Sequence, residues 1–342
     1  MDRGRRGSLS RVPVVRSIQA EHGARFAVEA VLTERGSRSG RGGEWAIVVH
    51  GGAGPIGEGR DETLRSGCAE AAARGAAVLE SGGSAIDAVC AAVEHLEDVP
   101  DFNAGRGSVL NRAGEIEVDA GLMTSDLAIG AVAAVPWLLH PIRLARLVLE
   151  DGRHVLLAGE GALAFARRYG IEPEPRERMV TPRAEARHAA RLARVPTGSE
   201  SSEPGDTVGA CALDLRGGLA AATSTGGTPG KRPGRVGDSP LAGAGFWVDA
   251  RHGAASATGT GEAIIRVLAS RQAIALLEVG HPVGTAAQGA VDAIGRPGRG
   301  EGGIIVLDRS GGIGLASSSQ AMPWASIVGG RGASGVLRRD SL

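Results

Sequence analysis

The stretch GDTVGACALDLRGGLAAATSTGG, residues 205–227, decides the fold. Two apolar runs, 209–215 and 219–224, flank the turn sequence Arg216-Gly217-Gly218. Strand-forming runs joined by a short Gly-rich turn are typical of a β-hairpin. We therefore expect antiparallel sheet here, with the far ends of the two strands close together.

A polar segment, 172–206, leads directly into this hairpin and is rich in Pro, Glu, Arg and Ser. It is either a surface loop or a processing site. Thr207 follows it, so a cut between Asp206 and Thr207 would leave Thr207 with a free α-amino group. Such an amine, with an ordinary pKa of about 7.7 to 8.0, can take the proton from a threonine hydroxyl, which is a poor nucleophile without a base. A threonine in this position is otherwise an ordinary strand residue.

Further polar groups follow the hairpin. Thr225 ends its second strand, so the pairing brings Thr225 close to Thr207. Arg235 and Asp238 lie three residues apart in a Gly- and Pro-rich loop. They form either a surface ion pair or a site for a zwitterionic amino-acid group. Residues 258–262, TGTGE, precede a predicted helix, and their N–H groups either stabilise an oxyanion or simply begin the helix.

The other elements predict helices packed on sheets. The apolar run 45–49 predicts a buried strand that enters a Gly-rich turn. Asp61 and Ser84 are predicted to cap two successive amphipathic helices. A strand is expected at 129–135 and one long helix at 261–280. The motif Leu-Asp-x-x-Gly-Gly of the hairpin recurs between two more apolar runs, which predicts a second hairpin at 304–308 and 313–317. This order indicates an α+β fold.

Composition excludes several classes of protein. Lys plus Arg number 38 and Asp plus Glu also number 38, so no overall charge favours nucleic acid or an anionic membrane. No run of apolar residues is long enough to span a bilayer. Cys68, Cys90 and Cys211 are too widely spaced for a zinc motif or a disulfide framework, which indicates a reducing compartment. We expect a cytoplasmic protein that binds neither nucleic acid nor membranes.

Residues 1–43 differ from the rest of the chain, with nine Arg against four acidic residues. We predict a disordered extension, or a translation start assigned too early. A secretory signal is not indicated, because no apolar run follows the arginines.

The order and spacing of these motifs resemble the plant-type asparaginase and isoaspartyl peptidase family, whose members are N-terminal-nucleophile hydrolases that use a threonine. The resemblance extends from about residue 45 to about residue 320. The matching stretches are 47–54, 82–89, 102–107, 206–210, 223–227, 234–240 and 258–262.

The resemblance implies a role for each residue of the reaction centre. Thr207 would be the nucleophile, freed when its own hydroxyl attacks the Asp206 carbonyl. Thr225 would assist that step and hold the Thr207 hydroxyl. Thr258 and the N–H group of Gly259 would form the oxyanion hole.

The resemblance also implies a substrate anchor and a cation site. Arg235 would bind the substrate α-carboxylate and Asp238 its α-ammonium group, with help from the Gly261 carbonyl. Asn103 would lie near the nucleophile. No cofactor would be required apart from a structural sodium ion. Its ligands would be the backbone carbonyls of Leu96, Glu97, Val99, Phe102, Ala104 and Arg106.

The fold implied by the resemblance is a four-layer αββα sandwich. Residues 44–342 would form one catalytic domain, cut into 44–206, with the flexible linker 172–206 at its end, and 207–342. Two cleaved protomers would form a homodimer. The substrates would be L-asparagine and isoaspartyl (β-aspartyl) dipeptides, and L-aspartate would be released.

Two features depart from the family pattern. Gly205 stands where many relatives have histidine, and residues 317–320 replace a stretch that contains Phe and Asn. Three alternatives remain open: a glycosylasparaginase-like hydrolase, an inactive homologue that never matures and acts as a scaffold, and a dinucleotide site at the GxGxxG match of residues 52–57.

Overall fold

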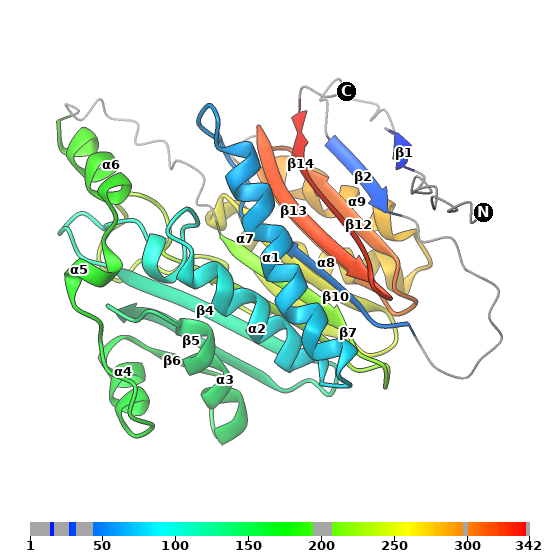
Figure 1. Ribbon diagram of the computed structural model, residues 1–342, viewed down its shortest axis with the longest axis horizontal. Helices are drawn as coiled ribbons and strands as arrows, with labels where there is room; N and C mark the ends of the chain where they lie inside the picture. The colour runs from blue at the N-terminus through cyan, green and yellow to red at the C-terminus, as the bar shows by residue number, and fades with distance from the viewer. Residues whose placement is uncertain (1–13, 17–26, 32–43, 194–206, 297–299, 340–342) are drawn as a thin grey trace, which may run out of the picture.

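Two β-sheets form the centre of the protein, and helices cover their outer faces (Figure 1). The computed structural model describes residues 14–16, 27–31, 44–193, 207–296 and 300–339. The fold is α+β, as the order of helices and hairpins predicted.

The larger sheet has eight strands and contains the hairpin predicted at 209–224. Its neighbouring strands pair antiparallel, except β5 and β6, which are parallel. In spatial order its strands are β14 (Arg331–Arg338), β13 (Ala321–Val328), β3 (Ala46–His50), β7 (Val208–Leu213), β8 (Leu219–Thr225), β4 (Glu117–Thr124), β5 (Ile129–Pro136) and β6 (Leu156–Ala158).

The smaller sheet has six strands, all antiparallel, and contains the second predicted hairpin. In spatial order they are β1 (Val14–Arg16), β2 (Ala27–Val31), β12 (Ile313–Ser317), β11 (Gly302–Asp308), β10 (Gly253–Gly259) and β9 (Phe246–Asp249). Strands β1 and β2 lie within the predicted disordered extension, so the structure differs from the prediction for these two segments. The backbone of β2 pairs with β12, which supplies an edge for it. The rest of 1–43 lies outside the described residues.

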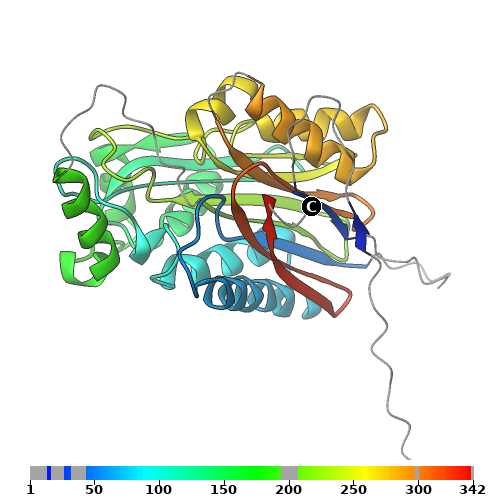
Figure 2. The same cartoon turned by 90° about the horizontal axis from the view of Figure 1, so that it is seen from above.

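Three apolar cores separate helices and sheets into layers. One core lies between α1 to α4 and the eight-stranded sheet, one between the two sheets, and one between the six-stranded sheet and α7 to α9. Figure 2 shows the strands in the middle, with α1 and α2 on one side and α8 and α9 on the other. The helices are α1 (Asp61–Glu80), α2 (Ala85–Asp98), α3 (Pro141–Asp151), α4 (Gly159–Arg167), α5 (Arg176–Met179), α6 (Pro182–Leu192), α7 (Gly261–Val267), α8 (Ala269–Glu278), α9 (Val283–Gly295) and the 3-10 turn η1 (Gly105–Gly107).

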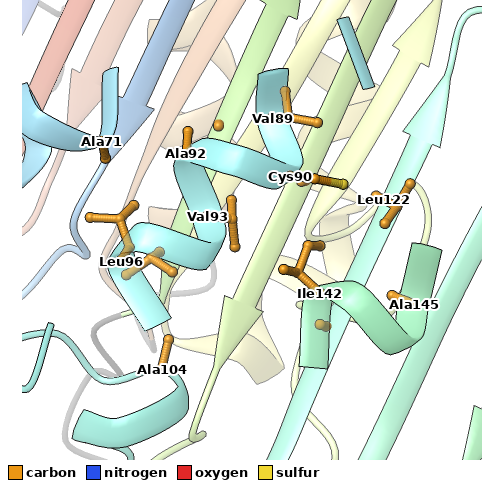
Figure 3. Packing of buried hydrophobic residues seen from close by; sticks show 14 of the residues in the cluster. Ala71, Val89, Cys90, Ala92, Val93, Leu96, Ala104, Leu122, Ile142 and Ala145 are labelled. Carbon is orange, nitrogen blue, oxygen red and sulfur yellow. The ribbon is translucent and has the colours of Figure 1, made fainter. Parts of the chain in front are cut away.

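Helix α2 packs on the sheet beside β7 and β8 through small apolar side chains. Val89, Ala92 and Val93 are fully buried on it (Figure 3). Its start is confirmed, because the Ser84 hydroxyl accepts a hydrogen bond from the N–H of Asp87 at 3.3 Å. Burial raises the pKa of the Cys90 thiol to about 12, so this cysteine is an inert core residue.

Two helix predictions were wrong in detail. Asp61 is the first residue of α1 and does not cap it, since Arg60 occupies the cap position. The helix predicted at 261–280 is broken at Leu268, whose φ is +49°. The break follows from tertiary contacts: the N–H of Arg271, at the start of α8, donates to the Gly243 carbonyl at 2.8 Å.

Part of the predicted flexible linker 172–206 is helical. Helix α6 begins at Pro182, and the Thr181 hydroxyl caps it by accepting from the N–H of Ala184 at 3.2 Å. Arg183 donates to the Asp101 carbonyl at 2.8 Å, which ties α6 to the loop after α2. Residues 194–206 lie outside the described residues.

Among the described residues, no helix has both the length and the apolar character needed to cross a membrane.

The two sheets approach each other closely at Gly209 of β7. A Cβ added to Gly209 would lie 2.5 Å from His50 Nε2 and 2.9 Å from the Ala222 carbonyl oxygen, and closer still to Ser256 Oγ. His50 and Ser256 join the two sheets through a 2.9 Å hydrogen bond. Only glycine allows this approach, so position 209 sets the spacing of the sheets.

We predict that Gly209→Ala lowers the free energy of unfolding by about 1–3 kcal/mol, because the added methyl group overpacks the space between the sheets. Urea unfolding of the full chain in a Thr207→Ala background, in which the predicted cut cannot occur, measures this. The control is Gly161→Ala in α4, where nothing lies within 4 Å of an added Cβ. Alanine there should be neutral or should stabilise the helix by about 0.5–1 kcal/mol. Equal stability of Gly209→Ala and its parent would contradict the prediction.

Candidate active site

Thr207 and Thr225 lie opposite each other at the end of the β7–β8 hairpin. The register of the hairpin ends with Val208 paired to Ser224, so one further step sets Thr207 against Thr225. Both threonines are buried, with 3% and 2% of their surfaces exposed. The structure thus brings together the two hydroxyl groups that the sequence singled out. Asp206, on the other side of the predicted cut, lies outside the described residues.

Asn103 holds the turn that follows Thr225. Its side-chain Nδ2 donates to the Gly227 carbonyl at 2.7 Å, and its backbone carbonyl accepts from the N–H of Gly226 at 2.9 Å. The Thr225 hydroxyl oxygen accepts from the N–H of Gly227 at 3.0 Å. Asn103 therefore fixes the backbone on which Thr225 sits, as a positioning residue.

Ser239 is a site residue that the sequence analysis missed. It is fully buried, and its Oγ donates to Thr207 Oγ1 at 3.5 Å, the upper limit for a hydrogen bond. Its carbonyl accepts from the Thr223 hydroxyl at 2.6 Å, which ties it to β8. In the sequence, the only feature that could have pointed to Ser239 is its position directly after Asp238. Ser239 links β8 and the start of β7 to the loop of Arg235 and Asp238.

Arg235, Asp238 and Gly261 come together as predicted. A Cβ added to Gly261 would lie 2.8 Å from Arg235 Nη2 and 2.9 Å from Asp238 Oδ1. Because Ser239 follows Asp238 in the chain and reaches Thr207, the end of β10 and the start of β7 converge on this loop. A cation and an anion thus lie near the threonine pair.

Glu262 is a second residue that the sequence analysis missed. Arg235 Nε donates to its Oε1 at 3.0 Å and Nη2 donates to its Oε2 at 2.9 Å, a bidentate pair. The signal was available, since Glu262 ends the TGTGE motif. The pair fixes the guanidinium plane and leaves N–H groups of Nη1 and Nη2 for another carboxylate.

Asp238 is a buried acid with a raised pKa. Burial raises its pKa to about 7, and Arg235 acts in the opposite direction. Its Oδ2 is buried and has no hydrogen-bond partner among the described residues. A buried acceptor of this kind favours a cationic ligand, which would restore the charged carboxylate.

Thr258 and Gly259 end β10. Thr258 is fully buried, and its Oγ1 has no hydrogen-bond partner within the described part of the chain. Gly259 adopts a φ of +133°, which favours glycine. These features are compatible with the predicted oxyanion hole, and its function stays a prediction.

His50 lies behind the threonine pair and is neutral. Burial lowers its pKa to about 3, while its interaction with the backbone of Thr207 raises it slightly. Its Nε2 lies 2.9 Å from Ser256 Oγ. A neutral imidazole at this depth is part of the support beneath Thr207.

The predicted sodium loop, 96–106, is compact. The carbonyls of Val99 and Ala104 accept from the N–H groups of Phe102 and Gly107 at 3.2 and 3.1 Å. A Cβ on Gly105 would lie 2.5 Å from the Glu97 carbonyl oxygen, so this carbonyl faces a narrow cradle. Carbonyl oxygens in such a cradle fit a hard cation. Leu96 and Phe102 are buried, and Arg106 is exposed.

The Glu97 side chain has a separate role in the same loop. Its Oε1 accepts from Ser224 Oγ at 2.6 Å and from the N–H of Ile142 at 3.1 Å. Burial raises its pKa, and the nearby His140 and the Ser224 hydroxyl lower it. Glu97 thereby joins α2 and α3 to β8, next to Thr225.

A different group of potential metal ligands, Asp249, His252 and Glu278, lies at the other end of β10. Asp249 Oδ1 already accepts from His252 Nδ1 at 2.8 Å, and Glu278 pairs with Arg271 at 3.1 Å. These local partners satisfy the carboxylates.

Comparison with known sequences gives the class of the protein. The family described as "Asparaginase" matches residues 43–335, and the chain belongs to this family.

Individual relatives are closely similar. The chain is 45% identical over 293 residues to the isoaspartyl peptidase/L-asparaginase of Mus musculus, covering 85% of this chain and 90% of the relative. It is 44% identical over 288 residues to the Homo sapiens protein of the same name, covering 83% and 94%. It is 43% identical over 294 residues to the isoaspartyl peptidase of Salmonella typhimurium, covering 81% and 93%.

We predict that Asp238→Asn gains stability relative to the wild type as the pH rises. The folded-state pKa of Asp238, about 7, lies above the ordinary pKa of an aspartate side chain, about 3.9, so its burial costs stability increasingly as pH rises from about 4 to 7. Asparagine has no such cost. Between pH 5 and pH 8 the variant should gain about 2–3 kcal/mol over the wild-type side chain.

Urea unfolding in a Thr207→Ala background, which keeps the chain in one piece, measures this difference. The control is Asp126→Asn, because the pKa of Asp126 is lowered by the Thr124 hydroxyl and its charge does not change between these pH values. A difference between Asp238→Asn and its parent that is constant with pH would contradict the assignment.

Proposed function

We propose that this protein is an autoproteolytically activated amidohydrolase that cleaves β-aspartyl amide bonds in isoaspartyl dipeptides and L-asparagine. One observation carries the proposal: a threonine pair at a strand end lies beside a buried carboxylate whose Oδ2 lacks a partner among the described residues and a guanidinium with free N–H groups. The names of the relatives agree with this chemistry.

Thr207 is the proposed nucleophile. After a cut before Thr207, its α-amino group takes the proton of Oγ1, and Oγ1 attacks the side-chain carbonyl of the substrate. Thr258 and the Gly259 N–H group hold the oxyanion that forms. The C–N bond breaks, the amine leaves with the proton, and water then hydrolyses the aspartyl ester to release L-aspartate.

The anchor explains selectivity for the β-linkage. Arg235 binds the α-carboxylate through the N–H groups that Glu262 leaves, and Asp238 binds the α-ammonium group, with the Gly261 carbonyl beside it. Both backbone groups of the substrate aspartate are thereby held. Only its side-chain carbonyl can then reach Thr207, so an α-linked peptide is not cut.

Maturation uses the same hydroxyl. Thr207 Oγ1 attacks the carbonyl of Asp206, the peptide bond shifts to an ester, and water hydrolyses that ester into a new carboxylate and a new α-amino group. Thr225 holds the Thr207 hydroxyl during the step. Gly205 removes a side chain that many relatives have beside the cut, so we expect slower cleavage here than in them.

The proposal also covers the fold type, a bound sodium ion, the cellular location and the oligomeric state. The layers of helix, sheet, sheet and helix are proposed to be the four-layer αββα sandwich of N-terminal-nucleophile hydrolases. A sodium ion in loop 96–106 would hold the backbone of Asn103 and take no chemical step. We further propose a cytoplasmic homodimer of cleaved protomers.

Two alternatives are distinguished by substrate and by maturation. A glycosylasparaginase-like enzyme would prefer N-acetylglucosaminyl asparagine to β-aspartyl dipeptides. A scaffold that never matures would remain one chain. The close similarity to relatives named isoaspartyl peptidase favours the first proposal over both.

We predict that the purified protein separates into two fragments that meet at Asp206 and Thr207, whereas Thr207→Ala stays intact. A denaturing gel with intact mass measures this, because the variant lacks the attacking hydroxyl. Thr228→Ala, a half-buried threonine in the loop after β8, is the control and should be cleaved normally.

The same samples test the activity. Cleaved wild type should release L-aspartate from β-aspartyl dipeptides and not from α-aspartyl dipeptides. A wild type that remains intact and releases no aspartate would overturn the proposal and favour the scaffold. Release from N-acetylglucosaminyl asparagine alone would favour glycosylasparaginase.

A further inference from the structure

Two acidic side chains of β4 hold the loop that carries the substrate anchor. Glu117 Oε1 accepts from the N–H of Gly234 at 2.9 Å, and Asp119 Oδ2 accepts from the N–H of Gly237 at 3.4 Å. Glu117 and Asp119 are two residues apart in the strand, so their side chains lie on the same face of β4. We call Glu117 and Asp119 the β4 acidic pair.

The two N–H groups are placed on either side of Arg235. Gly234 directly precedes Arg235, and Gly237 directly precedes Asp238. The β4 acidic pair therefore holds the loop on either side of Arg235 and directly before Asp238. A change in either hydrogen bond would move Arg235 and Asp238 relative to Thr207.

The Asp119 side chain is held in place by its burial and by backbone hydrogen bonds. It is fully buried, and its Oδ1 accepts from the N–H of Ala134 at 2.7 Å. Ala134 has a φ of +49°, and the register between β4 and β5 shifts between Val118 and Ala120. A non-glycine residue in this region is strained, and such an irregularity re-aims a side chain. The backbone is thus bent where Asp119 turns toward the anchor loop.

A buried lysine balances the charge of the pair. Lys231 is 5% exposed, and its Nζ donates to the Glu117 carbonyl at 2.7 Å. Burial lowers the pKa of Lys231, and the charges of Asp119 and Glu117 oppose that effect. Burial likewise raises the pKa of Asp119, and Lys231 and Arg235 oppose it. A charge this deep is costly, so the arrangement favours a specific role over general stability.

Asp119 also pairs with β8, the strand between β4 and β7. In the register of β4 with β8, Asp119 is paired with Thr225. Asp119 is therefore linked through its backbone to β8, which carries Thr225, and through its side chain to the anchor loop. Asp119, through its pairing with Thr225, therefore connects the anchor loop to the strand that lies beside Thr207.

We propose that Asp119 is a specificity-determining positioning residue, which with Glu117 sets the span between the Arg235–Asp238 anchor and Thr207 to the length of an aspartyl side chain. This inference rests on the proposed function. The span admits the β-carbonyl of aspartyl substrates and excludes the γ-carbonyl of glutamyl substrates, which lies one methylene farther from the anchor.

The test compares a β-aspartyl with a γ-glutamyl dipeptide on self-cleaved Asp119→Asn. The isosteric amide accepts one of the two N–H groups but turns its own NH₂ toward the other, so the loop loosens. We expect KM for the β-aspartyl dipeptide to rise about tenfold, with kcat within about threefold. The ratio of kcat/KM for the two dipeptides should fall about tenfold or more, within the range that one methylene can supply.

Two further variants sharpen the result. Glu117→Gln loosens the other hydrogen bond and should lower the same ratio by about threefold, so it tests the inference if Asp119→Asn fails to fold or to cleave. Asp126→Asn, at the exposed end of the β4–β5 turn, should leave the ratio unchanged. A merely structural defect reduces the active fraction and lowers both rates together, without changing their ratio.

The outcomes separate this inference from the function on which it rests. A wild type without β-aspartyl activity would overturn both. An active wild type together with unchanged ratios in Asp119→Asn and Glu117→Gln would overturn this inference alone and leave the proposed function standing.

Discussion

The close approach of the two sheets at Gly209 is the constraint on which the rest of the structure depends. With no Cβ at that position, the His50 imidazole can pass across β7 and meet Ser256 of β10 at 2.9 Å. Burial keeps this histidine uncharged, so the bridge between the sheets carries no desolvated charge. The spacing of the sheets then determines how near Thr258 and Thr207 can come. A side chain at 209 would separate the two halves of the site before any residue of that site was changed.

Positioning in this protein is achieved mainly by strand register and by backbone hydrogen bonds. The pairing of β7, β8 and β4 sets Thr207, Thr225 and Asp119 side by side on neighbouring strands. Buried side chains then hold the loops in place beside these strands, as Asn103 holds the turn at Gly227. Since a sheet is stiff, such a site costs little ordering when a ligand binds. The pKa of Asp238 is raised because its carboxyl group is buried in this site.

Several local features could be predicted from the sequence, although the start of α1 was placed one residue too late. The hairpin around Arg216-Gly217-Gly218 and the Ser84 cap depend on neighbouring residues, and both were predicted. The break at Leu268 was not predicted, because it depends on carbonyl groups near Gly243, which no local pattern reveals. Glu262 and Asp119 were missed for a related reason. The role of each acidic residue depends on the loop that it contacts. Glu262 lies 27 residues along the chain from its partner Arg235, and Asp119 lies 118 residues from its partner Gly237.

The order of strands in the larger sheet gives the proposed cut a lasting effect. Strands β7 and β8, which follow the cut, lie between β3 and β4, which precede it. The two fragments are therefore interleaved and would share every apolar core of that sheet. Cutting one bond would change the molecularity of folding, since a chain that folds alone becomes a pair that must find each other. The mature protein would persist through slow unfolding more than through reversible equilibrium, and each molecule could be assembled only once, from its uncut precursor.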